Sequence, residues 1–287
     1  MKRKDFIKKA LLGVTAAAAV PAVSKEINKP EGGAAFEQVG FNHLPSTEVK
    51  TMKTVLHKAA TRGHANHGWL DSHHTFSFAR YYDPERVQFG ALRVLNDDIV
   101  SGGMGFGTHP HDNMEIISIP LKGDLEHKDS MGNTQVIRQH DVQILSAGSG
   151  ITHSEYNKNK DRDVNFLQIW VFPKEKNIKP RYEQQSFLPE NRQNDLQLVV
   201  SPEKDQAVTI NQDAWFSLGN LEKGVEKTYR VKRNGNGVYV FVIDGDMTVE
   251  GQPLNRRDGF GIWDTEAITI KADSPAEVLL MDVPMNG

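Results

Sequence analysis

The stretch GTHPHDNMEIISIPLKGDLEHKDSMGNTQVIRQHDVQILSAGSGITHSEYN, residues 107–157, decides the fold of this chain. Apolar and polar residues alternate in short runs, and turns rich in Gly, Asn and Asp separate the runs at 122–124, 130–133 and 140–141. Short alternating runs with such turns between them are typical of antiparallel strands joined by hairpins. The stretch therefore predicts an antiparallel β-barrel.

Each end of this stretch carries two potential metal ligands. Residues two apart on a strand share a face, so His109 and His111 can point the same way, and so can His153 and Glu155. A single His-x-His is more often a surface or packing pair. Two such pairs, separated by strands of one barrel, favour a site where three imidazoles and a carboxylate hold one metal ion.

The ligand types restrict the metal. Imidazole and carboxylate without thiolate suit iron, manganese, nickel, copper or zinc, and a His/carboxylate site with open positions is typical of non-haem Fe(II) oxygenases. No histidine follows His153, so a second site of this kind cannot form later in the chain. We therefore expect one divalent transition metal per chain, and Fe(2+) is the first of these candidates.

The same residues resemble the cupin superfamily and, within it, the pirin family. The cupin motifs are Gly103-x5-His109-Pro-His111-x3-Glu115 and Gly150-x2-His153-x3-Asn157. The segments 126–133 and 150–155 resemble pirins, and 67–78, 93–98 and 181–184 resemble the bacterial quercetin 2,3-dioxygenase-like branch of that family. Departures from these patterns occur at Lys122, Gly148 and 112–113, and none of them removes a ligand.

The resemblance implies a chemistry and a ligand set. It implies a dioxygenase that opens the ring of flavonols such as quercetin, with insertion of both atoms of O2 and loss of carbon monoxide. It assigns His109, His111, His153 and Glu155 as ligands, and Glu155 could also accept the substrate hydroxyl proton. Glu115 is the competing carboxylate, which generic cupins use as a ligand and pirins do not. If its strand stays regular, Glu115 should lie directly behind the ligands.

Two other functions remain open. Some pirins are iron-dependent binding partners of transcription factors, so the chain could be a non-catalytic redox sensor or interaction protein. It could also be a cupin enzyme with a different substrate, because one fold hosts many functions. An export signal, if functional, argues against the sensor.

Composition excludes several classes of protein. With 38% hydrophobic and 25% charged residues, the chain is typical of a soluble globular protein. A net charge of −3 without a basic stripe gives no support for nucleic-acid binding. The absence of cysteine excludes disulfides, thiolate ligands and a cysteine nucleophile. We expect a monomer whose partners are a small aromatic substrate and O2.

The N-terminus has the layout of an export signal. Basic residues precede an apolar run at 10–23, which is short for a membrane span. We predict a twin-arginine-like signal peptide at 1–22, with Lys4 in place of the second arginine, and a linker at 23–50. The alternatives are an ordinary Sec signal and an uncleaved anchor. The protein would then be periplasmic without stable membrane association, or cytoplasmic if the signal does not function.

The rest of the chain repeats the barrel pattern. The turn at 244–246 matches 122–124, Arg257-Asp258 matches His140-Asp141, and 276–284 matches 165–173. We predict an all-β bicupin, two antiparallel jelly-roll barrels packed together, with a metal-binding domain at 51–178 and a metal-free domain at 179–287. Before the first motif, we expect loops at 62–64 and 67–70 and a strand at 75–82. His73 and His74 are adjacent and would face opposite ways on a strand, so at most one could reach a metal, and we expect packing roles for both.

Overall fold

The computed structural model describes residues 51–204 and 207–286. These residues form 22 strands and two short 3-10 turns, η1 (Ala59–Thr61) and η2 (Pro189–Arg192), with no α-helix in the described ranges. None of their segments is a helix long and apolar enough to span a bilayer. The predicted all-β class is confirmed. The predicted signal peptide and linker lie outside the described residues.

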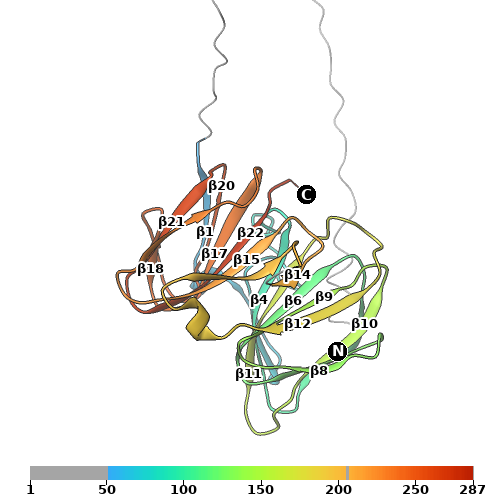
Figure 1. Ribbon diagram of the computed structural model, residues 1–287. Coiled ribbons are helices and arrows are strands. Elements are labelled where there is room, and N and C mark those ends of the chain that lie inside the picture. The colour runs from blue at the N-terminus through green and yellow to red at the C-terminus, as the bar shows by residue number, and fades with distance from the viewer. Residues whose placement is uncertain (1–50, 205–206, 287) are drawn as a thin grey trace, which may run out of the picture.

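The first group of strands forms a barrel from a seven-stranded sheet, in the order β12-β9-β6-β11-β4-β3-β2, and a four-stranded sheet, in the order β5-β10-β7-β8 (Figure 1). Its strands are β2 (Gly63–Asn66), β3 (Leu70–His74), β4 (Leu92–Val100), β5 (Gly105–His111), β6 (Glu115–Lys122), β7 (Leu125–Asp129), β8 (Thr134–Ile137), β9 (Asp141–Ser146), β10 (Ile151–Asn157), β11 (Val164–Val171) and β12 (Arg181–Ser186). Neighbouring strands are antiparallel throughout.

The second group also has a seven-stranded and a four-stranded sheet, in the orders β1-β20-β17-β22-β15-β13-β14 and β16-β21-β18-β19. Its neighbouring strands are antiparallel except β13 and β14, which are parallel. Its strands are β1 (Lys53–His57), β13 (Leu196–Ser201), β14 (Val208–Thr209), β15 (Trp215–Leu221), β16 (Glu226–Arg230), β17 (Asn236–Asp244), β18 (Met247–Val249), β19 (Gln252–Leu254), β20 (Gly259–Trp263), β21 (Ala267–Ala272) and β22 (Ala276–Pro284). The predicted bicupin architecture is therefore confirmed.

The internal repeat extends to the turns. Gly123 and Gly245, with φ of 79° and 80°, occupy the matching turns after β6 and β17. A left-handed backbone of this kind favours glycine. In the second matching turn, the Asp141 and Asp258 carboxylates each accept a hydrogen bond from the backbone N–H three residues upstream, at 2.8 and 2.9 Å. The same turn chemistry therefore occurs at the same place in both barrels.

The barrels exchange strands at their contact. β1 pairs along its whole length with β20 of the second barrel, although β1 precedes the first barrel in the sequence. In return, β12 pairs with β9 of the first barrel. Strand pairing thus crosses the predicted boundary at 178/179 in both directions, and the domain division remains a prediction. Figure 1 shows β1, in blue, within the orange and red barrel.

One apolar core joins the two seven-stranded sheets. It contains Ile117 and Ile119 from β6 together with Phe241 and Leu279 from the second barrel. Because side chains alternate along a strand, the even-numbered residues of β6 face the interior of the first barrel instead. Ser118, for example, hydrogen-bonds a carboxylate there. This alternation determines which side chains can reach the metal centre described below.

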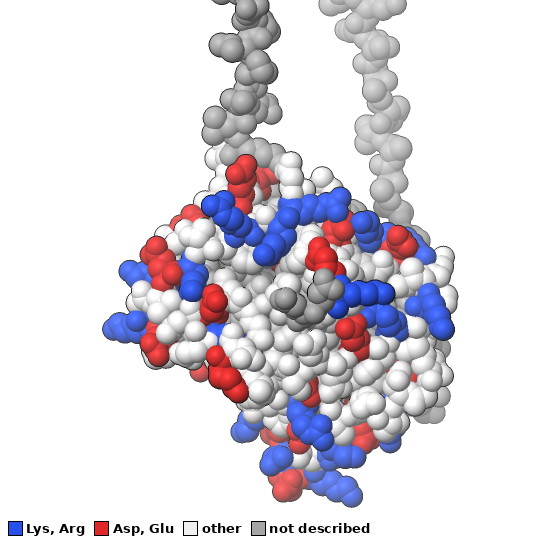
Figure 2. Space-filling view, viewed as in Figure 1, with Lys and Arg blue, Asp and Glu red and all other residues white. Residues whose placement is uncertain are grey.

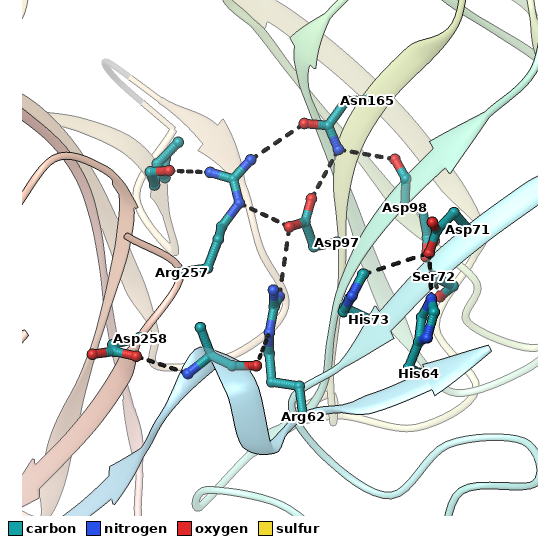
Figure 3. Close-up of polar contacts among 12 residues, drawn as sticks. Arg62, His64, Asp71, Ser72, His73, Asp97, Asp98, Asn165, Arg257 and Asp258 are labelled. Carbon is teal, nitrogen blue, oxygen red and sulfur yellow. Dashed lines mark hydrogen bonds and ion pairs between the residues drawn. The ribbon is translucent and has the colours of Figure 1, made fainter. Parts of the chain in front are cut away.

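A buried polar network lies at one edge of the same interface (Figure 3). The Arg257 guanidinium donates to Asp97 at 2.8 Å and to Asn165 at 3.3 Å, and Arg62 lies 3.5 Å from the same Asp97 carboxylate. Burial alone would raise the pKa of Asp97, but Arg257, the Asn165 amide and Arg62 hold it below its ordinary value. The carboxylate therefore stays ionised and joins both barrels.

The face of the molecule in Figure 2 carries both signs of charge, with lysine and arginine interspersed among aspartate and glutamate. No continuous area of one sign dominates that face. The expectation that the chain does not bind nucleic acid remains a prediction.

Candidate metal centre

The pairing of β5 with β10 brings the three predicted histidines together. His109 and His153 are direct cross-strand partners, and His111 lies two residues further along the same face of β5. The ring centroids are 4.4 Å apart for His109 and His153, and 4.9 Å apart for both pairs with His111. One ligand atom from each ring lies within 4.8 Å of the other two. This spacing suits a single ion.

The three imidazoles are neutral at neutral pH. Burial is the main cause, and it lowers the pKa of His111 to about 3, that of His153 well below its ordinary value, and that of His109 in the same direction. His109 Nδ1 donates to the Gly107 carbonyl at 2.8 Å, which leaves Nε2 as a free acceptor. His153 Nε2 is buried without a hydrogen-bond partner among the described residues. A metal ion would satisfy both nitrogens.

Glu155 adds the carboxylate. One of its oxygens lies within 4.8 Å of ligand atoms of His153 and His127. Oε1 accepts hydrogen bonds from Ser118 at 3.2 Å and from the Gln168 amide at 3.1 Å, and Oε2 accepts from the same amide at 3.0 Å. These donors fix the orientation of the carboxylate beside the imidazoles, as partners of metal ligands commonly do.

His127 is a residue that the sequence analysis missed. It is fully buried on β7, with Nε2 3.0 Å from Asp129 Oδ2 and Nδ1 3.5 Å from His153 Nδ1. If Nε2–H donates to Asp129, Nδ1 can accept from His153 Nδ1–H, and this order leaves His153 Nε2 without a proton. In the sequence, His127 could have been recognised as a potential ligand by its i, i+2 spacing from Asp129. The pairing of β7 with β10 then places both residues beside His153 and Glu155.

Glu115 does not lie behind the ligands, so that prediction is wrong. Its carboxylate faces the second barrel, where it accepts from Ser146 at 2.8 Å and from the Asn211 backbone N–H at 3.1 Å. Burial raises its pKa, partly offset by these two bonds. The parity argument failed because the strand is interrupted after His111, with Asn113 at a φ of 45°.

The segment before the first motif also differs from the prediction. Strand β2 occupies 63–66, although a loop was expected at 62–64, whereas 67–69 lies between strands, as expected for the loop at 67–70. β3 occupies 70–74, and 75–82 contains only a bridge between Phe78 and Tyr81 instead of the expected strand. His73 and His74 face opposite sides of β3, and neither joins the three imidazoles. His74 packs edge-on against Phe78 at 5.2 Å, and burial lowers its pKa to about 4.

The histidines and Glu155 line a cavity of about 40 Å³. Its remaining wall is partly apolar and partly polar, formed by Leu70, Phe78, Phe106, Ile116, Trp170, Ser72, Asn96, Asp98 and Gln168. Burial raises the pKa of Asp98 to about 7, and its hydrogen bond from Ser72 acts in the opposite direction. A cavity of this size has room for water, since about 10–15 Å³ is the least that one water molecule needs.

Comparison with known proteins identifies the family. The family model described as "Pirin" matches residues 50–171, and "Quercetinase C-terminal cupin domain" matches residues 198–283. A relative from Escherichia coli (strain K12), named "Quercetin 2,3-dioxygenase", is 47% identical over 230 residues, which are 80% of this chain and 98% of the relative. The chain belongs to the pirin family. Both the predicted family and its quercetin 2,3-dioxygenase-like branch are confirmed, and with them the prediction that the chain is an enzyme.

Other pirins extend this picture. A "Pirin-like protein" from Caulobacter vibrioides is 40% identical over 222 residues, 77% of this chain and 95% of that protein. The crystal structure of the bacterial pirin YhhW from Escherichia coli, in complex with nickel(II), is 46% identical with a TM-score of 0.77, and the match covers 81% of this chain and 99% of that one. A quercetin 2,3-dioxygenase structure from Acinetobacter baumannii, at 20% identity and a TM-score of 0.68, shares the fold.

The second barrel of this pirin encloses an apolar cluster. Val240, Val242, Ile262 and Leu280 are fully buried in one cluster, as the sequence predicted. Within residues 51–204 and 207–286, every group of three potential ligands lies between positions 64 and 155. The second barrel, as far as it is described, has no counterpart of the histidine centre.

Proposed function

We propose that this pirin is a metal-dependent dioxygenase that cleaves the ring of a flavonol such as quercetin with O2. Its metal would be held by His109, His111, His153 and Glu155. The observation that carries the proposal is the convergence of three neutral imidazoles beside an oriented carboxylate in a buried cavity. The names of the relatives support the reaction.

The proposed metal is Fe(2+). Neutral imidazole and carboxylate ligands with open positions suit ferrous oxygenases, although nickel binds the same ligand types more tightly. The nickel(II) complex belongs to the Escherichia coli relative. Metal analysis of protein isolated from its native compartment tests the choice of iron.

The bound metal would supply the redox and Lewis-acid chemistry that lets O2 react with the deprotonated flavonol. Glu155 would accept the proton of the substrate hydroxyl, since its carboxylate lies beside the histidines and is held by Ser118 and Gln168. The aromatic wall that includes Phe78 and Phe106 would exclude water from the reacting atoms.

The small size of the cavity favours a second candidate substrate. A volume of about 40 Å³ is far below the 300–1,000 Å³ usual for sites that enclose a drug-sized ligand. A flavonol would bind across the mouth or displace apolar side chains such as Phe106. A smaller aromatic substrate of the same chemistry needs less rearrangement, and it is the alternative that the geometry favours.

The test is oxygen consumption together with carbon monoxide release by iron-loaded protein, with and without quercetin. We expect both signals to depend on iron and on quercetin, and to disappear in His109→Ala/His111→Ala. Fully iron-loaded wild type without turnover would refute the flavonol proposal. Oxygen consumption with a smaller phenol would then favour the second candidate, and inertness toward both would refute both candidates.

We also propose export to the periplasm through residues 1–22, followed by a monomeric mature protein without stable membrane association. N-terminal sequencing of the protein from a periplasmic fraction tests the cleavage, and sedimentation tests the oligomeric state. A mature chain that begins at Met1 in the cytoplasm would refute the export proposal.

A further inference from the structure

A second group of potential ligands lies on the outer face of the first barrel. β2 and β3 pair so that His64 and His73 are direct cross-strand partners. Their rings stack with centroids 4.5 Å apart and planes inclined by 19°. Asp71 is two residues before His73 and therefore shares its face of β3.

These three side chains converge on one point. His64 Nε2 lies 2.7 Å and His73 Nδ1 3.7 Å from the same oxygen, Asp71 Oδ1. One ligand atom from each residue lies within 4.8 Å of the other two. Figure 3 shows His64 and His73 near the Asp71 carboxylate, with His73 on the side of Asp97, its cross-strand partner on β4.

This group is separate from the central histidines. Ser72 and His74, which alternate with it along β3, are buried and face the barrel interior, where Ser72 lines the cavity. Asp71 and His73 face outward, and the side chains of His64, His73 and Asp71 are 51%, 36% and 38% exposed. An ion from solvent can reach them directly.

A simple His–Asp ion pair is the competing interpretation. It accounts for His64 and Asp71, but it does not use His73, whose nitrogen faces the same oxygen. Burial, followed by Arg62 and His64, lowers the pKa of His73. Two protonated rings stacked at 4.5 Å would also repel each other. A neutral His73 is therefore available as a metal ligand.

We propose that His64, Asp71 and His73 form a second divalent-metal site, with two imidazoles and one carboxylate. Such ligands suit zinc, nickel or copper, and water would complete the coordination. Among the described strands, the four-residue β2 pairs with β3 alone and ends its sheet. A metal joining His64 to two residues of β3 would therefore hold this edge strand in place.

Zinc is the probe for the test, with metal content measured after equilibrium dialysis. We expect His64→Ala/His73→Ala to bind one zinc fewer than wild type. His67→Ala, which removes an exposed histidine of the same segment, should bind as much as wild type. His109→Ala/His111→Ala should also lose one zinc, from the central site, and should keep the outer one.

Hydrogen exchange gives an independent readout. Zinc should slow exchange of the β2 amides in wild type and in His109→Ala/His111→Ala, but not in His64→Ala/His73→Ala. Asp71→Asn keeps the size of the side chain and guards against misfolding, and it should weaken this outer site about 10-fold or more. Equal zinc content in wild type and His64→Ala/His73→Ala, or β2 exchange that zinc leaves unchanged, would overturn the proposal.

Discussion

Replacement of Glu155 by glutamine separates the structural role of this side chain from its proposed chemical roles. The substitution keeps the size of the side chain but removes its charge and its basic oxygen. Both carboxylate oxygens of Glu155 accept from the Gln168 amide, whereas the new glutamine has one oxygen that can accept and an NH2 group that cannot. Gln168 Oε1 has no partner among the described residues, so a half-turn of that amide would let it accept from the new N–H.

The expected cost in stability is consequently small. One rearranged hydrogen bond changes the free energy of unfolding by about 1 kcal/mol. Turnover per bound metal should fall much further, by about 10²-fold or more, the usual loss for a missing general base. A 10²-fold loss corresponds to about 2.7 kcal/mol in the activation barrier. Metal affinity should also fall, because a negative ligand becomes neutral.

The assay compares oxygen consumption with quercetin for wild type and Glu155→Gln reloaded to equal iron content, so that affinity and chemistry are not confused. Urea unfolding of the metal-free proteins measures the stability change. Equal turnover per iron in the two proteins would refute the base role and leave Glu155 as a ligand. Unchanged iron affinity would refute the ligand role.

Three further substitutions test the surroundings of the site and the contact between the barrels. His127→Phe should weaken metal binding by about 10–100-fold, because His153 loses the ring that orients it; unchanged affinity in a metal titration would contradict this. Burial raises the pKa of Asp98 from 3.8 to about 7, so the folded chain retains a proton that the unfolded chain releases. Stability of the metal-free wild type should therefore fall relative to Asp98→Asn by about 2–3 kcal/mol between pH 5 and pH 8, and parallel pH profiles in urea unfolding would exclude this. Arg257→Met should destabilise the protein by about 3 kcal/mol, because Asp97 remains buried and keeps only its weaker partners; an unchanged denaturation midpoint would show that the ion pair contributes nothing.

Local sequence determined much of this protein. The two-residue period of a strand is a local property, so it placed His109 with His111 and His153 with Glu155 correctly on shared faces. Turn residues are local as well, which is why the matching turns before Leu125 and Met247 could be recognised as parts of one repeat. The lack of histidine after His153 predicted a second barrel without a matching centre, and the described part of that barrel encloses an apolar cluster instead.

Strand pairing, in contrast, was decided by the tertiary structure. Which strands pair depends on contacts between residues far apart in sequence. The two-residue period and the β propensity of a single strand contain no information about these contacts. The exchange of β1 and β12 between barrels is of this kind. So is the position of His127, whose strand had to be paired with β10 before it could meet His153.

Glu115 shows where local reasoning ends. Its spacing of four residues from His111 predicted that Glu115 would face the metal ligands. The turn at Asn113 interrupts the strand, and Glu115 faces the second barrel instead. The sequence thus determined which potential ligands share a strand face, two by two. The tertiary structure decided which pairs meet and which carboxylate faces them, because parity holds only along one uninterrupted strand, and the meeting of strands is set by burial of their apolar faces.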